Sequence, residues 1–223
     1  MTREPLADAR SFILANTRLT AVPHVPEIML HVADESVALW RKTEEELGEA
    51  GLPPPYWAFA WAGGQALARF LIDHPERVRD LRVLDLASGS GLVAIAAARA
   101  GAVPVVAADI DPFAECAIAL NAVANDVYID AVTQDLLEGP APRATRYDVI
   151  CVGDLFYERD TAARVMSFLD RHAAVGSAVL IGDPGRAYLP KERLEQQCEY
   201  SVPVTRDLED QEIKRTAVWS LRG

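Results

Sequence analysis

Residues 82–112, RVLDLASGSGLVAIAAARAGAVPVVAADIDP, constrain the fold more than any other stretch of the chain. A short apolar run ends at Asp85 and leads into a loop of small residues that contains Gly89 and Gly91. An alanine-rich apolar run then predicts a helix, and a second apolar strand ends at Asp109. Strand, glycine-rich turn, helix, strand and acid in this order are typical of the first unit of a nucleotide-binding α/β sheet.

The glycines and the second acid have a chemical reason to occupy these places. Glycine turns tightly and lets a ligand approach the backbone without a Cβ in the way. N–H groups at the turn favour a carboxylate or phosphate, and Asp109 at a strand tip can accept hydrogen bonds from ribose hydroxyls. Asp111 precedes Pro112, a favoured helix start, so we assign Asp111 to helix capping and Asp109 to the ligand. An ordinary βαβ unit without a ligand is the alternative.

The length and composition are those of one large folded domain or of a domain with an added arm. The chain has 223 residues, and 50% of them are hydrophobic. The net charge of −11 counts against a nucleic-acid partner, because neutralising phosphates requires a basic surface. No apolar run is long enough to span a bilayer, and the N-terminus lacks the apolar core of a signal peptide. We therefore expect no nucleic-acid or membrane partner.

The cysteines and histidines predict neither a metal site nor disulfide bonds. Cys116, Cys151 and Cys198 are scattered and have no CxxC spacing, and the four histidines are dispersed. Free thiols are typical of a reducing compartment, so we expect a cytoplasmic protein. The expected oligomeric state is a monomer, because the sequence has no conspicuous apolar stripe.

Two segments of different character divide the chain. Residues 1–50 form an N-terminal appendage, in which apolar spacing predicts a helix over residues 4–17 and a strand over residues 27–33. A charged helix is expected over residues 36–47, before a run of prolines. Residues 51–223 form the main domain, and the appendage is expected to pack on its sheet and to shape access to the site.

Strands and helices alternate through the rest of the main domain. The last two strands are separated only by residues 207–211, so they must be antiparallel. We therefore predict an α/β, Rossmann-like fold with a seven-stranded, mostly parallel sheet, a C-terminal antiparallel hairpin and helices on both faces. The predicted helices cover residues 65–72, 112–124, 161–172 and 190–197, and the predicted strands cover residues 129–133, 147–152, 177–181, 200–206 and 212–221.

Residues 53–71, PPPYWAFAWAGGQALARFL, place two tryptophans just before a predicted helix. Aromatic side chains on such a loop can stack on a purine or line a cleft. The alternative is a hydrophobic plug between the appendage and the sheet. Trp57 is expected to be structural even if Trp61 is not.

Three more residues that suit a ligand site follow predicted strands. Asp135 lies at a strand tip, where an acid can accept a hydrogen bond from the exocyclic amine of adenine, although a solvated loop acid is the alternative. Asp154 and Tyr157 come just after the next strand. Because open α/β sheets bind ligands at the carboxyl ends of their strands, we expect these residues to share one edge with Gly89 and Asp109.

Two cofactors compete for the glycine loop. Gly89-x-Gly91-x-x-Ala94 fits the dinucleotide pattern, with Asp109 at about the expected 20 residues, so an NAD-binding oxidoreductase is a rival. Asp85 counts against it, because a pyrophosphate disfavours an acid before the loop, whereas the ammonium of an amino-acid moiety favours one. The terminal hairpin and the lack of a second catalytic domain in this sequence also count against a dehydrogenase.

Four short motifs together match one family. They are LDLASGSG at residues 84–91, AADIDP at 107–112, TQD at 133–135 and GDLFY at 153–157. With them the chain resembles the seven-strand, Rossmann-like S-adenosylmethionine-dependent methyltransferases over most of residues 50–222. Through PYWAFAWAGGQALARFL and GDLFYE it is more narrowly similar to the lysine methyltransferases of the electron-transfer flavoprotein β-subunit.

The resemblance implies a role for each residue of the cofactor site. Gly89 and Gly91 would pass close to the methionine part of S-adenosylmethionine, and Asp85 would help to hold its ammonium group. Asp109 would take the ribose hydroxyls, and Asp135 the adenine amine.

The resemblance also implies a channel for the target lysine. Asp154 and Tyr157 correspond to an acid-x-x-aromatic motif that lines this channel, and both are candidate catalytic residues. Asp154 would also contact the cofactor, and Trp61 would line the cofactor side of the cleft. Ala87 and Ser88 depart from the residues that many relatives have there, a small change that should not abolish binding.

The expected function is S-adenosylmethionine-dependent methylation of a protein lysine, with the electron-transfer flavoprotein β-subunit as the expected partner. A methyltransferase for a ribosomal protein or a small molecule is the nearest rival function. Two rivals from different classes are an NAD-binding oxidoreductase and a non-catalytic interaction module.

Overall fold

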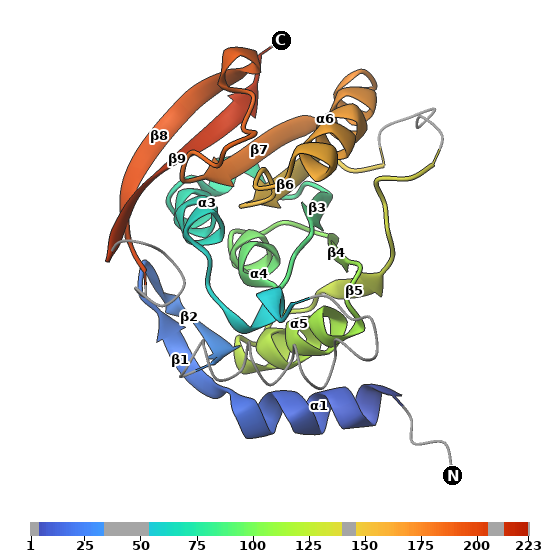
Figure 1. Ribbon diagram of the computed structural model, residues 1–223, viewed down its shortest axis with the longest axis vertical. Coiled ribbons are helices and arrows are strands. Elements are labelled where there is room, and N and C mark those ends of the chain that lie inside the picture. The colour runs from blue at the N-terminus through green and yellow to red at the C-terminus, as the bar shows by residue number, and fades with distance from the viewer. Residues whose placement is uncertain (1–4, 34–53, 140–145, 205–211, 223) are drawn as a thin grey trace.

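The computed structural model describes residues 5–33, 54–139, 146–204 and 212–222, and a seven-stranded sheet lies at its centre (Figure 1). The strands lie in the order β5-β4-β3-β6-β7-β9-β8. Neighbours from β5 to β7 are parallel, and β9 is antiparallel to both β7 and β8. The predicted fold class is therefore confirmed. The strands are β3 (Val83–Leu86), β4 (Val105–Asp109), β5 (Asp130–Thr133), β6 (Val149–Gly153), β7 (Ala178–Asp183), β8 (Leu194–Pro203) and β9 (Ile213–Leu221).

Helices cover both faces of the sheet, as predicted. Successive strand residues point to opposite faces. In β3, Val83 joins the core beneath α3 and α4, whereas Leu84 joins the core beneath α6. Parallel strands buried on both faces account for the nearly continuous apolar runs in the sequence. The helices are α1 (Pro5–Asn16), α3 (Ala62–Asp73), α4 (Leu92–Arg99), α5 (Pro112–Ala124) and α6 (Arg159–Ala173), with short 3-10 turns η2 (Tyr56–Ala58), η3 (Pro75–Arg77) and η4 (Lys191–Arg193).

The appendage contains α1 and a separate two-stranded hairpin, β1 (Arg18–Val22) and β2 (Val25–Val32). The helix predicted over residues 4–17 is confirmed as α1, and the strand predicted over residues 27–33 is confirmed as β2. The strand β1 was not predicted. The helix expected over residues 36–47 lies outside the described residues. In α1, Ile13 is fully buried and belongs to a cluster with residues of η2 and α5. The N-terminal segment thus packs on α5.

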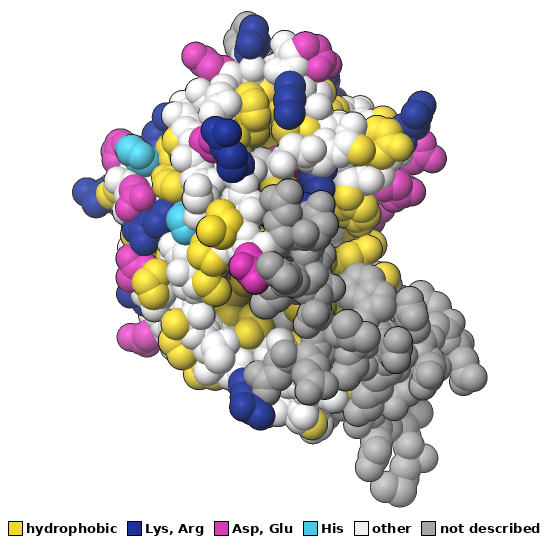
Figure 2. All heavy atoms as spheres, turned by 60° about the vertical axis from the view of Figure 1, so that its left-hand side comes forward, with side chains coloured by type: hydrophobic (Ala, Val, Ile, Leu, Met, Phe, Trp, Pro, Cys, Tyr) yellow, Lys and Arg dark blue, Asp and Glu magenta, His cyan; other side chains and the backbone are white. Residues whose placement is uncertain are grey.

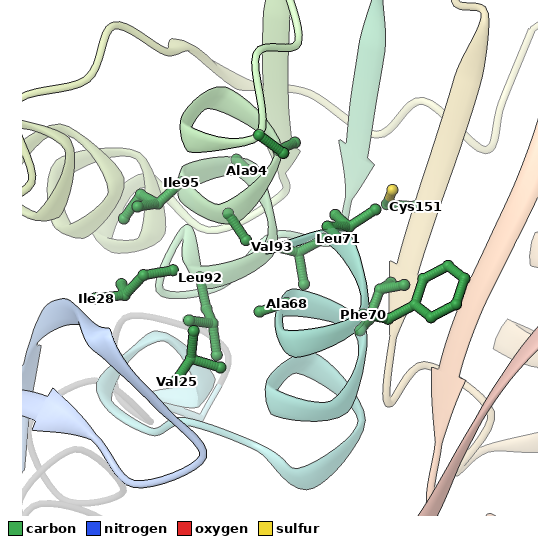
Figure 3. Close-up of a cluster of buried hydrophobic side chains, with 14 of the residues drawn as sticks. Val25, Ile28, Ala68, Phe70, Leu71, Leu92, Val93, Ala94, Ile95 and Cys151 are labelled. Carbon is green, nitrogen blue, oxygen red and sulfur yellow. The ribbon is translucent and has the colours of Figure 1, made fainter. Parts of the chain in front are cut away.

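Side chains of β2 also enter the main core. Val25 and Ile28 lie beside Leu92 and Ile95 of α4, and the cluster continues to α3 (Figure 3). All four side chains are almost completely buried. The hairpin is therefore held by the hydrophobic core as well as by polar contacts.

Two asparagines of α5 hold the backbone of β2. The Asn125 Oδ1 accepts a hydrogen bond from the Met29 N–H at 2.9 Å, and its Nδ2 donates to the Met29 carbonyl at 2.6 Å. The Asn121 Oδ1 accepts from the His31 N–H at 2.8 Å. A side-chain amide has the donor and acceptor of a peptide group, so these two residues serve as a neighbouring strand would.

The prediction of a helix over residues 190–197 is wrong. Only the short turn η4 forms there, and β8 begins at Leu194. Pairing with β9 runs the full length of the strand, from Leu194 opposite Leu221 to Pro203 opposite Ile213. Because β8 lies at the edge of the sheet, few of its side chains need to be buried, and its hydrophobic pattern is weak. Pairing with β9 therefore decides that this segment is a strand.

The described surface has mixed character. Figure 2 shows the side of the molecule that carries β8 and β9, where basic, acidic and hydrophobic side chains are interspersed. No helix among the described residues has both the length and the apolar character needed to cross a membrane. All three cysteines are free, and Cys116 and Cys151 are buried.

Candidate functional site

The carboxyl ends of the parallel strands meet at one edge of the sheet, and most predicted site residues gather there. The glycine loop follows β3, Asp109 ends β4, and Asp154 follows β6. The turn η2 lies over the loop, since a Cβ on Gly89 would be 3.8 Å from the Cα of Trp57. This edge is where open α/β sheets bind their ligands.

Three residues of the glycine loop have positive φ. The angles are 54° at Ala87, 54° at Gly89 and 82° at Gly91. At Gly91, which precedes α4, a Cβ would lie 3.3 Å from the Ile118 side chain of α5. Gly91 is therefore required for its conformation and for helix packing, while Ala87 adopts a conformation that glycine would adopt at lower cost.

The buried Asp85 carboxylate holds this loop to the start of α4. Its Oδ2 accepts hydrogen bonds from the Ser88 hydroxyl at 2.5 Å and from the Ala94 N–H at 3.0 Å. Burial raises the pKa of Asp85 to about 7, although these two hydrogen bonds oppose the rise. A cationic group beside it would favour the ionised form. The predicted contact with an ammonium group stays a prediction.

Asp109 fastens the loop from the other side. Its Oδ2 accepts the Gly89 N–H at 2.8 Å, and its Oδ1 accepts the N–H groups of Ile110 at 2.8 Å and Asp111 at 3.1 Å. Burial raises its pKa. A carboxylate has about four acceptor positions, and these three N–H groups use three of them. The position left on Oδ2 can accept a hydrogen bond from a ligand hydroxyl.

Asp111 caps α5, as predicted. Its Oδ1 accepts the Phe113 N–H at 2.8 Å, and Pro112 occupies the first helical position. Burial raises the pKa of Asp111 to about 6, and the neighbouring Asp109 charge adds to the rise.

Asp154 lies between the start of α3 and the loop after β7. Its Oδ2 accepts the N–H groups of Gly63 and, at 3.1 Å, Gly64. Its Oδ1 accepts two hydrogen bonds from the Arg186 guanidinium, at 3.1 Å from Nε and 2.8 Å from Nη2. The N-terminus of a helix favours a negative charge, so the position suits an ionised carboxylate.

Close contact between glycines brings the start of α3 to the sheet. A Cβ on Gly63 would lie 2.2 Å from the Gly182 carbonyl oxygen of β7, and one on Gly182 would lie 2.1 Å from the Gly63 oxygen. A Cβ on Gly153 would lie 3.1 Å from the Cα of Gly64. These contacts place the first N–H groups of α3 against Asp154.

Aromatic side chains form a wall beside Asp154. The ring centroid of Tyr56 lies 6.0 Å from that of Trp61 and 5.9 Å from that of Tyr157, and the Trp61 Nε1 donates to the Tyr56 carbonyl at 3.0 Å. The Arg186 Cζ lies 5.9 Å from the Trp61 ring centroid, within reach of a cation–π interaction. Burial, followed by the Tyr56 contact, raises the pKa of Tyr157 to about 12. The wall thus presents neutral aromatic faces next to a carboxylate.

The two tryptophans have different surroundings, as expected. Trp57 is buried and stacks on Phe113 of α5 with 6.1 Å between ring centroids. Trp61 is partly exposed at the edge of the site. The hydrophobic-plug interpretation therefore fits Trp57, whereas a role for Trp61 in lining a cleft stays a prediction.

Asp135 lies apart from this cluster of contacts. Its Oδ2 pairs with the Arg164 Nη2 at 2.7 Å, and its Oδ1 accepts the Leu137 N–H at 3.0 Å. Its side chain is 39% exposed, which agrees with the solvated-acid interpretation. A role toward adenine stays a prediction.

Arg186, Asp183 and Tyr56 also lie at this site, and none of them was predicted from the sequence. Asp183 is buried at the end of β7, and its Oδ1 accepts the N–H groups of Gly185 at 2.6 Å and Arg186 at 2.7 Å. Burial raises the pKa of Asp183 to about 6. The segment GDPGR at residues 182–186 could have indicated these residues. It places an acid at the end of a buried strand and a turn directly after it, as the neighbouring strands do.

Known relatives cover nearly the whole chain. It is 40% identical over 220 residues to the electron transfer flavoprotein beta subunit lysine methyltransferase of Xenopus laevis, a match that covers 95% of this chain and 86% of that protein. The human protein of the same description is 33% identical over 222 residues, with 96% and 82% covered.

Two further comparisons concern the main domain and its fold. A family model described as Ribosomal protein L11 methyltransferase (PrmA) matches residues 66–155. The crystal structure of magnesium protoporphyrin IX methyltransferase from Synechocystis PCC 6803 with bound SAH has a TM-score of 0.52 at 14% identity, covering 84% of this chain and all of that chain. At this identity the likeness supports the fold alone.

Proposed function

The chain belongs to the electron transfer flavoprotein beta subunit lysine methyltransferase family, and from this premise we propose that it methylates a lysine of that subunit. It is accordingly an S-adenosylmethionine-dependent methyltransferase. The observation that best supports a lysine substrate is the Asp154 carboxylate beside the Trp61 ring, a place that already holds the cationic end of Arg186.

The residues at the sheet edge fit S-adenosylmethionine. Asp109 keeps an acceptor position for a ribose hydroxyl, and the loop around Gly89 and Gly91 brings backbone close to the site. Asp85 offers a carboxylate for the ammonium group, and the partly exposed Trp61 would line the cofactor side of the cleft. When bound, the cofactor supplies an electrophilic methyl group on a positively charged sulfur.

The remaining task of the protein is to deliver a neutral, aligned amine. A lysine amine has a pKa of about 10.4 in water, so it must lose a proton before it can attack. A partly desolvated site with aromatic walls favours the neutral amine. Asp154 orients the amine and accepts its proton directly or through water, and Tyr157 bounds the channel. Alignment of the nucleophile supplies most of the acceleration.

The rival functions have narrower support. The family model for ribosomal protein methylation matches only residues 66–155, whereas the lysine methyltransferase relatives match nearly the whole chain. The dinucleotide pattern is confined to the glycine loop. We also propose that the protein acts as a monomer in the cytoplasm, where its three free cysteines would stay reduced.

Two measurements test this function. In titration calorimetry with S-adenosylhomocysteine, NAD and NADP, the protein should bind S-adenosylhomocysteine alone. Labelled methyl transfer to the purified electron transfer flavoprotein beta subunit, followed by mass spectrometry, should locate methyl groups on lysine. Selective binding of NAD, or a beta subunit that takes no label, would refute the proposal.

A variant of Asp154 tests the assignment of the catalytic residue. Asparagine tolerates the φ of 56° at this position and keeps the size of the side chain while removing its charge. Asp154→Asn should lose methyl transfer and keep binding of S-adenosylhomocysteine. Methylation at the wild-type rate would show that Asp154 has no catalytic role.

A further inference from the structure

Arg186 occupies the place at Asp154 that a lysine substrate would need. Its guanidinium donates two hydrogen bonds to the Asp154 Oδ1 and lies over the Trp61 ring. A long aliphatic side chain that ends in a cation, bound by a carboxylate and an aromatic face, has the chemistry of a bound lysine. The Arg186 side chain thus makes the contacts that a bound substrate lysine would make.

Asp154 has no acceptor position to spare while Arg186 is bound. Among the described residues, two N–H groups from the start of α3 and two from the guanidinium donate to its two oxygens. A carboxylate has about four such positions. A substrate amine can therefore bind Asp154 only after one of these donors has left.

The donors from α3 cannot leave easily. They belong to the backbone of Gly63 and Gly64, and Gly63 is in direct backbone contact with Gly182 of β7. Moving this backbone would separate the helix from the sheet.

Arg186 can release Asp154 without moving its backbone. Asp183 holds the Arg186 N–H at 2.7 Å and the preceding Gly185 N–H at 2.6 Å, so the turn stays in place. The Arg186 side chain is 22% exposed and has several rotatable bonds. Rotation of the side chain toward solvent is the smaller change.

We propose that Arg186 is a specificity-determining residue that occupies the Asp154–Trp61 site in the free enzyme and is displaced there by the amine of the substrate lysine, an inference that rests on the proposed function. The exchange replaces one cation by another, so the Asp154 carboxylate is never left buried without a positive partner. A neutral ligand cannot make this exchange, so the lysine enters the site as an ammonium group and gives its proton to Asp154, directly or through water, before it attacks.

The test compares Arg186→Ala and Arg186→Lys with wild type and with Arg193→Ala. Arg193 pairs with Asp170 at 2.7 Å and serves as the matched surface control. Without the competing guanidinium, Arg186→Ala should have a KM for the beta subunit about tenfold lower than wild type, as expected for loss of one charged hydrogen-bonding competitor, with kcat largely kept. Arg186→Lys should have an intermediate KM, and Arg193→Ala the wild-type KM.

A binding measurement separates this inference from the proposed substrate. With S-adenosylhomocysteine present, n-butylammonium, which has the length and head group of a lysine side chain, should bind Arg186→Ala about tenfold more tightly than wild type. Added methylguanidinium should compete with it in that variant. These results would support the exchange even if the beta subunit took no methyl group, in which case the substrate proposal alone would fail.

Two results would overturn the inference. A lower kcat with unchanged KM in Arg186→Ala, restored by Arg186→Lys, would mean that Arg186 holds Asp154 in position for the reaction. Equal affinity of n-butylammonium for wild type and Arg186→Ala would mean that the guanidinium does not compete for this site. If Arg186→Ala fails to fold, the same comparisons with Arg186→Lys decide.

Discussion

The glycine contact between α3 and the sheet predicts opposite effects for two adjacent substitutions. A Cβ on Gly63 would lie 2.2 Å from the Gly182 oxygen and 2.5 Å from the Asp154 Oδ2. A Cβ on Gly64 would meet nothing closer than the Leu92 side chain at 3.8 Å, an ordinary contact. Gly63→Ala and Gly64→Ala therefore add the same methyl group at adjacent positions. They differ in the room that the surrounding atoms leave for it.

The magnitudes follow from these distances. Overpacking costs about 1–3 kcal/mol, and the upper end applies to Gly63→Ala because a backbone carbonyl cannot rotate away. A loss of about 3 kcal/mol lowers Tm by roughly 6–12 °C in a domain of this size. Alanine is favoured over glycine inside a helix, so Gly64→Ala should gain about 0.5–1 kcal/mol.

Thermal and urea melts of the two variants and wild type measure this difference. Gly63→Ala should also weaken methylation, because α3 moves away from Asp154, while Gly64→Ala keeps it. Equal Tm values for Gly63→Ala and Gly64→Ala would refute the packing argument.

Three further predictions concern stability around the site. The pKa of Asp85 is raised to about 7 in the folded protein, whereas that of an aspartate in the unfolded chain is about 4. The folded state therefore binds this proton more tightly. Through Asp85, the free energy of unfolding falls between about pH 4 and 7, by up to about 1.4 kcal/mol per pH unit. Asp85→Asn should make this fall in stability shallower in urea melts across that range, with Asp111 and Asp183 still contributing below about pH 6. Parallel profiles for variant and wild type would contradict the assignment to Asp85. Ala87→Gly should raise stability by up to about 1 kcal/mol, because glycine relieves the φ of 54°; a lower Tm would argue against strain there. Asn125→Ala leaves both backbone groups of Met29 without this partner and should cost about 2–4 kcal/mol in urea melts, whereas a loss below about 0.5 kcal/mol would mean that water replaces the amide.

Some features could be predicted because they depend on neighbours in the chain. Asp111 caps α5 through a hydrogen bond to a residue two positions away, and Pro112 follows it directly. The glycine loop and Asp109 belong to one strand–helix–strand unit, with 20 positions between Gly89 and the acid that accepts its N–H. Local hydrogen bonds and hydrophobic periodicity leave a readable pattern, and the order of strands follows from it.

Several features depend instead on residues that only the fold brings together. Gly63 and Asp154 are 91 positions apart, and Asp154 and Arg186 are 32 positions apart. Nothing near Arg186 in the sequence indicates that its charge is directed at Asp154, and nothing near Asp135 indicates its pairing with Arg164. The segment that forms β8 has a weak pattern of its own and becomes a strand by pairing with β9. The sequence by itself therefore determined the sheet, the glycine loop and the acids at the strand ends, because local geometry dictates them. The partners of those acids were decided by packing between distant elements, since a charge pairs with whatever group the folded chain places within reach.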